Sequence, residues 1–276
     1  MQSYVVNRVL SNNVLMVESG DENHILIGKG IGFGKKKGSV IDNLDKVEEQ
    51  FISLKGLDKN EHDRFISQID PNVIEVVNDV LLLFENTFEI KLDSANRVGL
   101  IDHVNFAVKR IREGVEIVNP FLFETEILYP EEYELAKKAI KRIEEALGIE
   151  IPQAEIGFLT LHFYGGRSNT SKNKALEHSK MMNSIIGHVD SKIEGGLDKN
   201  AFFGKRFIFH LLGVMRRVMD EKTTENLFMD QIKNNLALEF KLAYDIAKIM
   251  EQTLRKPVPE SEMGYIAMHL HKLSNK

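Results

Sequence analysis

Four histidines of this sequence lie at matching positions in two copies of a duplicated segment. Residues 101–162, moved by 107 positions onto residues 208–269 without a gap, give 15 identities in 62 positions. Ordinary globular composition would give about four by chance. His103 matches His210 and His162 matches His269, so each copy separates its two histidines by the same number of residues. The duplication therefore points to chemistry that needs two imidazoles.

An arginine and a glutamate accompany each pair of histidines at helical spacing. Arg110 and Arg217 follow His103 and His210 by seven residues, which is two helical turns along one face. Glu155 and Glu262 precede the other two histidines by seven residues. If the two helices of each copy pack together, two imidazoles, a guanidinium and a carboxylate can converge.

Three kinds of chemistry suit such a set. The histidines could be hydrogen-bonding groups between helices, as buried histidines commonly are. They could bind zinc or iron, but no two have the i, i+4 spacing of HExxH, and His269 and His271 lie on different helix faces. They could be reversibly phosphorylated, because neutral imidazole is a nucleophile and arginine binds the added negative charge. Phosphorylation explains why His and Arg repeat together, and we expect no metal site.

A second candidate ligand site lies near the N-terminus. Residues 28–40 contain four lysines and no acid, although residues 1–55 hold seven basic and seven acidic side chains. An extended backbone from Gly28 to Gly34 would place the glycines on one face and the side chains between them on the other. Phe33 could then stack on an unpaired base while the lysines contact phosphates, as in proteins that bind RNA loops. A glycine-rich edge strand with solvated lysines is the alternative interpretation.

Composition excludes several other function classes. The chain has 36 basic and 41 acidic side chains and a net charge of -5, so a nucleic-acid site has to be local. Without cysteine there is no disulfide scaffold, thiolate nucleophile or iron–sulfur cluster. The lysine-rich segment lacks GxxxxGK[ST], no GxSxG elbow occurs, and we expect neither an enzyme nor a cofactor. Apolar runs are far shorter than a membrane span, which predicts a soluble, cytoplasmic protein.

The surrounding elements predict a multidomain chain. Short β-branched runs at 4–10, 14–17 and 24–27, with a further strand at 51–54, indicate a small antiparallel β-sheet. Beyond residue 70 the apolar residues have helical spacing, as at 133, 136, 140, 143 and 147. We therefore expect a β-sheet domain over 1–56, a linker over 57–69, and two homologous all-α helical-bundle domains over 70–169 and 170–276.

The order of these features resembles the BglG/SacY-type transcriptional antiterminators. The resemblance rests on residues 8–14, on the block 27–36, and on the paired histidines of two helical domains. Such proteins carry a co-antiterminator RNA-binding domain and two PTS regulation domains. The segment Gly28 to Gly34 is most similar to the glucose-type branch of this family.

The resemblance implies that the small domain, as a homodimer, binds an antiterminator hairpin in a leader RNA. Binding would prevent an overlapping terminator hairpin and allow transcription of a sugar-PTS operon, with glucose as the expected sugar. Asn13, Gly28, Lys29 and Phe33 match the family's RNA-contacting positions, and Lys35 and Lys36 extend the same basic segment. Many relatives have arginine where this chain has Lys29, so a bidentate contact would become a point-charge contact.

The resemblance also implies control by phosphorylation of His103, His162, His210 and His269. The sugar permease (EIIB) and the carrier protein HPr would be the phosphate donors, and Arg110 and Arg217 would stabilise the phosphate. The copies differ beside the first histidine, where Asp102 is replaced by Phe209. The alternative is a histidine-phosphorylated sensing module that acts through protein contacts without binding RNA.

Overall fold

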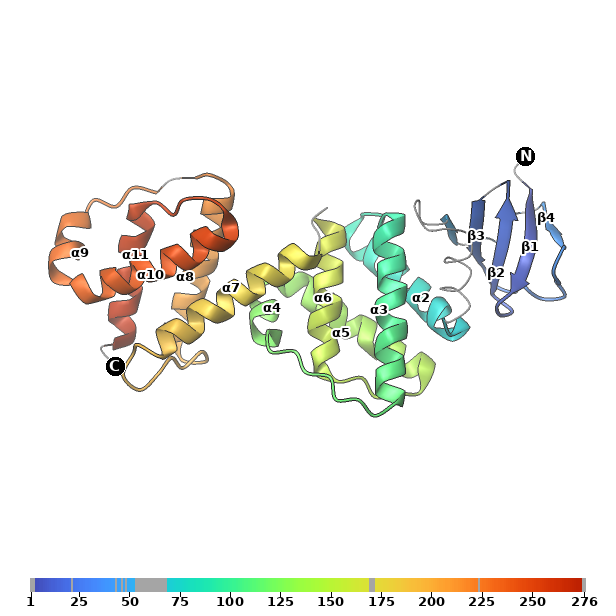
Figure 1. Ribbon diagram of the computed structural model, residues 1–276, viewed down its shortest axis with the longest axis horizontal. Coiled ribbons are helices and arrows are strands. Elements are labelled where there is room, and N and C mark those ends of the chain that lie inside the picture. Colours follow the sequence, from blue (N-terminus) through green and yellow to red (C-terminus); the bar gives the residue numbers. More distant parts are fainter. Residues whose placement is uncertain are drawn as a thin grey trace. The chain divides into compact units, whose positions relative to one another are not determined.

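The computed structural model describes residues 3–20, 22–42, 44, 45, 47, 49–52, 69–168, 172–222 and 224–274. The chain forms two compact units, Met1–Lys172 and Asn173–Lys276 (Figure 1). The first unit holds the β-sheet and one set of helices, and the second unit is helical. The predicted fold class, a small antiparallel sheet followed by two helical domains, is confirmed. Most of the predicted linker, residues 57–68, lies outside the described residues.

The sheet has five antiparallel strands in the order β4-β1-β2-β3-β5. Their bounds are β1 Tyr4–Val9, β2 Val14–Ser19, β3 Glu22–Ile27, β4 Val40–Ile41 and β5 Glu49–Ile52. Strands β2 and β3 form a hairpin in which Val14 pairs with Ile27 and Ser19 pairs with Glu22. The four predicted strands are therefore present, and β4 is an addition that the sequence did not predict.

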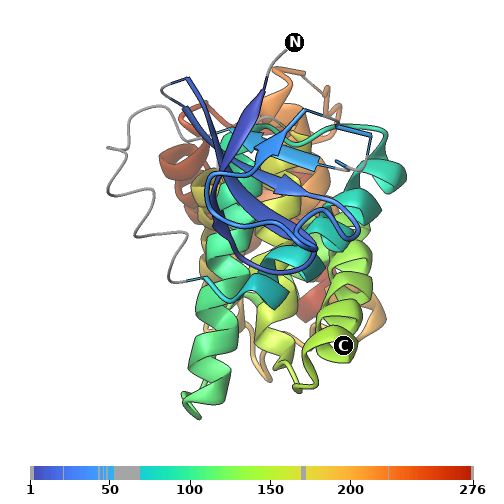
Figure 2. The same ribbon diagram turned by 90° about the vertical axis from the view of Figure 1, so that its right-hand side faces the viewer.

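The two faces of the sheet bury different sets of side chains. Leu15, Val17 and Leu26 join Tyr4, Val6, Ile31 and Ile41 in one small core. The alternate residues Val14, Met16, Ile25 and Ile27 belong instead to the large core of the first helices. This division follows from the two-residue period of a strand. Figure 2, in which the sheet lies towards the viewer, shows the helices behind it.

Helix α2 spans Pro71–Phe88 and lies against strand β2. It begins where the Asp70 side chain accepts a hydrogen bond from the Asn72 amide, and Pro71 occupies the first turn. Its apolar face, which includes Val73, Val77 and Phe84, is fully buried. The sheet and the first helices therefore share a core, a contact that the sequence did not predict.

The remaining helices show the duplication directly. The first unit contains α3 Ser94–Arg112, α4 Leu122–Leu128, α5 Pro130–Leu147 and α6 Gln153–Arg167. Helix α7 spans Lys172–Asp190 and precedes α8 Phe202–Met219, α9 Met229–Asn235, α10 Ala237–Leu254 and α11 Glu260–Ser274. A shift of 107 residues carries α4, α5 and α6 onto α9, α10 and α11 residue for residue, and α3 onto α8 apart from its first residue. Among the helices that the structure describes, none has the length and hydropathy of a membrane span.

The segment 28–34 is not extended, so the expected alternation of glycines and side chains is wrong. It forms consecutive turns in which the Ile31, Phe33 and Lys35 amides donate to carbonyls three residues earlier. Gly30 and Gly34 both have a φ of 70°, a backbone region that glycine adopts without strain. The turn buries Ile31 and exposes Phe33, which an extended strand would place on the same face.

Candidate functional site: two histidine pairs and an N-terminal loop

In the first unit, α3 and α6 pack so that their repeated side chains meet. The rings of His103 and His162 lie 4.7 Å apart, centroid to centroid. The carboxylate of Glu155 lies between a ring and a guanidinium: its Oε2 is 3.0 Å from His103 Nε2, and its Oε1 accepts a 2.9 Å hydrogen bond from Arg110. The structure thus brings together all four side chains at this site.

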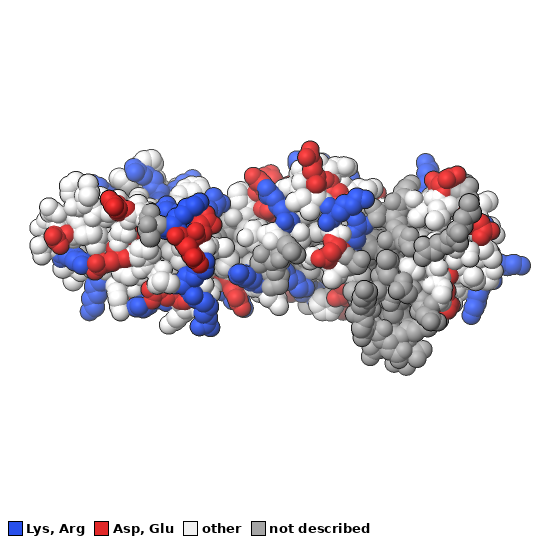
Figure 3. Space-filling model, turned by 90° about the horizontal axis from the view of Figure 1, so that it is seen from above, with Lys and Arg blue, Asp and Glu red and all other residues white. Residues whose placement is uncertain are grey.

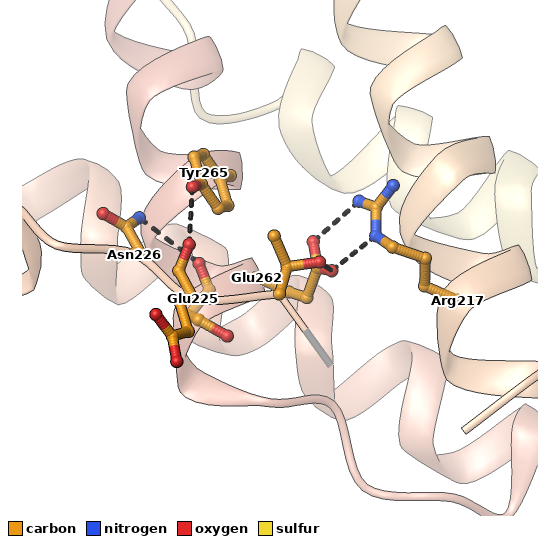
Figure 4. A network of polar contacts seen from close by, with 7 residues as sticks. Arg217, Glu225, Asn226, Glu262 and Tyr265 are labelled. Atoms are coloured by element: carbon orange, nitrogen blue, oxygen red, sulfur yellow. Dashed lines mark hydrogen bonds and ion pairs between the residues drawn. The ribbon is translucent and has the colours of Figure 1, made fainter. Parts of the chain in front are cut away.

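The second unit repeats the arrangement with a tighter arginine contact. The rings of His210 and His269 are stacked at 4.3 Å, with their planes 25° apart. Arg217 donates two hydrogen bonds to Glu262, of 2.6 and 2.8 Å, and Thr224 adds a third at 3.1 Å. Figure 4 shows the Arg217 guanidinium facing both carboxylate oxygens. Glu262 is completely buried, so this pair anchors α8 to α11.

Arg110 and Arg217 are therefore engaged by glutamates in the structure. Although burial alone would raise the pKa of Glu262, its hydrogen bonds and charge interaction with Arg217 hold that pKa below its ordinary value. A phosphoryl group would have to share or displace this carboxylate to reach Arg217. The same competition applies at Arg110 and Glu155.

Burial keeps three of the four repeated histidines neutral at physiological pH. It lowers the pKa of His162 to about 2, with His103 and Lys172 acting in the same direction. It lowers the pKa of His210 to about 4, with a further contribution from His269. Burial and then the charge of Arg206 also lower the pKa of His269. A neutral imidazole keeps a lone pair on one ring nitrogen, which a phosphoryl acceptor needs.

Other repeated residues are explained by packing. Asn226 lies over Gly264, where an added Cβ would be 2.7 Å from the Asn226 amide nitrogen and 2.6 Å from Met229 Sδ. Asn119 lies over Gly157 in the same way, at 2.5 Å. Each asparagine also accepts a hydrogen bond from the backbone two residues later. The repeated Asn and Gly therefore hold a loop against the helix that carries the second histidine.

The described residues contain no group of three or more His, Asp or Glu side chains placed to bind a metal ion. The rings of each pair lie face to face, tilted by 32° in the first pair and by 25° in the second. Phe209, which replaces Asp102 in the second copy, is 65% exposed and lies beside His210 in the sequence.

At the other candidate site, two loops of the β-sheet are joined by hydrogen bonds. The side-chain oxygen of Asn13 accepts from the Gly30 amide at 2.8 Å, and the Asn13 carbonyl accepts from Gly28 at 2.9 Å. Gly32 donates to the Asn12 carbonyl and approaches so closely that a Cβ would lie 2.3 Å from the Ser11 carbonyl oxygen. These contacts bring Asn13 next to the glycine turn.

The turn presents its aromatic and basic side chains to solvent. Phe33 is 79% exposed, which is far more than a core phenylalanine would be. Lys29, Lys35 and Lys36 are exposed around it. On the face of the molecule shown in Figure 3, basic and acidic side chains are interspersed over the helical units. The sequence-predicted RNA-contacting residues thus share one region, although not by the extended geometry expected.

Helix α2 also reaches this region, through a residue that the sequence reasoning missed. Glu75 accepts hydrogen bonds from the Ser11 hydroxyl and, at 3.2 Å, from the Asn13 side-chain amide. No sequence signal links residues so far apart when one of them is an ordinary acidic position on a helix. The contact places a carboxylate of the helical part on the loop that carries Asn13.

Comparison with known proteins places these features in a family. The CAT RNA binding domain model matches residues 4–60, and the PRD domain model matches residues 78–166 and 183–273. The chain is 35% identical over 277 residues to the PtsGHI operon antiterminator of Bacillus subtilis (strain 168), covering 99% of this chain and 98% of that protein. It is 31% identical over 280 residues to Protein GlcT of Staphylococcus aureus (strain JH9), covering 100% and 99%. The crystal structure of GlcT CAT-PRDI matches with a TM-score of 0.50 and 38% identity, over 60% of this chain and 99% of that chain.

Proposed function

Because this chain belongs to the family of antiterminators that join a CAT RNA-binding domain to PRD domains, we propose that it is an RNA-binding antiterminator of a glucose-type PTS operon. It acts in the cytoplasm by binding, as a homodimer, a leader-RNA hairpin whose formation prevents the terminator. The proposed domains are residues 1–56, 70–169 and 170–276, with a linker at 57–69. The observation that carries the RNA-binding part is the exposed Phe33, in the same turn as Gly30, whose amide donates to Asn13.

The surroundings of Phe33 suit an unpaired base and its phosphates. An aromatic ring that is 79% exposed can stack on a base, and Lys29, Lys35 and Lys36 lie in the same loop to bind phosphate oxygens. Gly28 itself is buried, and its amide donates to the Asn13 carbonyl, so it holds the turn next to Asn13. Once the Asn13 side-chain amide no longer donates to Glu75, it can hydrogen-bond a base or sugar edge of the RNA.

Histidine phosphorylation supplies the control. His103, His162, His210 and His269 are the proposed acceptors, with the sugar permease (EIIB) and HPr as donors. A phosphoryl group adds about two negative charges next to buried Glu155 or Glu262, which disfavours the present packing of α3 on α6 or of α8 on α11. Arg110 and Arg217 stay candidates for binding the phosphate, in competition with these glutamates.

Glu75 couples the helical part to the RNA-binding loop. Its carboxylate occupies the Asn13 amide and the Ser11 hydroxyl, and it would repel an RNA phosphate at the same place. RNA binding therefore requires α2 to release this loop. A change in helix packing that follows phosphorylation can alter that release, because α2 shares its core with α3, α5 and the sheet.

The test is a titration of the full chain with an internal-loop hairpin RNA from a ptsGHI leader, with duplex DNA and with single-stranded RNA, over a salt series. Hairpin-selective binding that Phe33→Ala weakens by about fivefold or more is expected, since base stacking contributes about 1–3 kcal/mol. Phe228→Ala, which removes a phenylalanine of similar exposure from the second unit, should bind normally. Absence of hairpin binding at low salt, where phosphate contacts are strongest, would favour the sensing module that acts only through protein contacts.

A further inference from the structure

The second histidine pair opens onto a pocket that contains two cations. The pocket has a volume of about 180 Å³ and is lined by His269 together with Phe203, Arg206, Met268 and Lys272. None of the described residues that line it carries a carboxylate. Within the part of the chain that the structure describes, neither Arg206 nor Lys272 forms an ion pair with an acidic side chain. The pocket therefore has an uncompensated positive charge beside an imidazole.

Helical geometry explains why both cations lie at this pocket. Arg206 precedes His210 by four residues on α8, and Lys272 follows His269 by three residues on α11. Side chains three or four residues apart lie on the same helix face. Because the two rings are stacked at 4.3 Å, the neighbouring turns of α8 and α11 present their cations to the same space. The charge of Arg206 acts on the His269 ring directly.

The first histidine pair lacks these two cations. The shift of 107 residues that superposes the helices places Gly99 opposite Arg206 and Gly165 opposite Lys272. The charges that act on His162 come from His103 and then from Lys172 at the start of α7. An added Cβ at Gly99 would meet no atom within 4 Å, so lack of space does not explain the glycine there. The cations are a property of the second copy alone.

Within the second pair, the two rings also differ in access. Nε2 of His210 is buried and has no hydrogen-bond partner among the described residues. His269 lines the open pocket. A donor can therefore approach His269 from the side on which the two cations lie.

We propose that His269 is the phosphoryl acceptor of the second domain and that Arg206 and Lys272 bind the phosphoryl group it receives. This rests on the proposed control by histidine phosphorylation and specifies its second site. Two charge-assisted hydrogen bonds from these side chains would offset the two negative charges of the product. Arg217 is then not needed for the phosphate and continues to anchor Glu262.

The transfer is balanced without a further reactant. The unprotonated ring nitrogen of His269 attacks the phosphorus of a phosphohistidine on the carrier protein. The new N–P bond forms as the donor's N–P bond breaks, and the released electron pair returns to the donor ring nitrogen. The second nitrogen of each ring keeps its proton. Arg206 and Lys272 contact the phosphoryl oxygens throughout, where negative charge is present before and after transfer.

The experiment compares the full chain with a variant that carries Arg206→Gln and Lys272→Gln. Phosphoramidate, a small donor with a P–N bond, and phosphorylated HPr are used separately, and occupancy of each histidine is measured by mass spectrometry at alkaline pH. A control variant with Lys205→Gln and Lys241→Gln removes two exposed charges from the same unit. The expected result is a loss of about tenfold or more in the rate at His269 with both donors. Occupancy in the first domain should not change.

The outcomes separate this inference from the function on which it rests. If no histidine of the full chain accepts phosphate from either donor, the proposed control by phosphorylation is wrong. If the second domain is phosphorylated on His210 instead, or on His269 at the same rate in both variants, only the role of the pocket is wrong. A loss with HPr but not with phosphoramidate would also overturn it, because the cations would then bind the carrier and not the phosphoryl group. As a gain-of-function test, Gly99→Arg should raise the rate at His162.

Discussion

The side-chain amide of Asn13 donates a 3.2 Å hydrogen bond to Glu75, 62 residues later in the chain. Asn13 lies in the part of the chain that the CAT RNA binding domain model matches, and Glu75 lies near the start of helix α2. The same amide cannot bind a base edge while the carboxylate holds it, and the carboxylate repels phosphate. If Asn13 contacts RNA as proposed, this pair couples RNA affinity to the packing of α2.

Glu75→Gln should raise the affinity of the full chain for hairpin RNA by about fivefold or more, since a hydrogen bond to a charged group contributes about 1.5–3 kcal/mol. The neutral amide removes the charge that repels phosphate and weakens the hold on Ser11 and Asn13. Binding is measured by fluorescence anisotropy at two salt concentrations. Glu89→Gln, at the exposed C-terminal end of the same helix, removes the same charge far along α2 and serves as the control. Equal affinities of the two variants would contradict a link between Asn13 and Glu75.

Glu262→Ala should destabilise the second unit by about 2–3 kcal/mol, because it leaves Arg217 and Thr224 without their buried partner. The pKa of Glu262 is held below its ordinary value of 4.5, so its ionised form contributes stability above about pH 4.5. That contribution is lost as pH falls through the lowered pKa. Urea unfolding of wild type and variant should thus give a difference that is full at pH 7 and shrinks in acid. A difference that stays constant down to pH 3 would argue against the ion pair.

The ring of His210 should stay neutral in the folded protein until the pH falls to about 4. Burial is the main cause, followed by the charge of His269. Since the folded pKa lies below the ordinary 6.5, neutral His210 contributes stability above pH 6.5 that is lost as pH falls towards about 4. NMR of the ring protons gives the midpoint, and the urea-unfolded chain gives the reference. A folded-state midpoint near 6.5 would show that the ring is hydrated.

Gly264→Ala should cost about 1–3 kcal/mol, because the new Cβ would lie within 2.7 Å of Met229 and Asn226. The matched control is Gly187→Ala on α7, where a Cβ meets nothing within 4 Å and alanine is the better helix former by about 0.5–1 kcal/mol. The two substitutions should therefore have opposite signs in urea unfolding. If both stabilise, Asn226 can move away without loss, and the repeated asparagine does not hold the loop.

Several features follow from the sequence because they depend on local spacing. The duplication of residues 101–162 is visible as identities, and the matching bounds of α4, α5 and α6 with α9, α10 and α11 are its direct consequence. The apolar spacing at Tyr133, Ala136 and Ile140 places one face of α5 in the core. The strands at the N-terminus follow from short runs of β-branched residues, and the glycine and lysine content of residues 28–40 predicts a ligand-binding segment there.

The tertiary structure decided what the local pattern leaves open. Glycine permits both extended and left-handed backbone, so the turn of residues 28–34 is set by its hydrogen bonds with Asn12 and Asn13. Arg110 and Arg217 could serve a phosphate or a carboxylate, and only the packing of α3 on α6 and of α8 on α11 assigns them to glutamates. Glu75 reaches the loop that carries Asn13 because α2 packs on the sheet, and Arg206 and Lys272 share one pocket because α8 packs on α11. These contacts form only when side chains from separate elements meet in space. The spacing of residues along one helix or strand does not predict which distant element will pack against it.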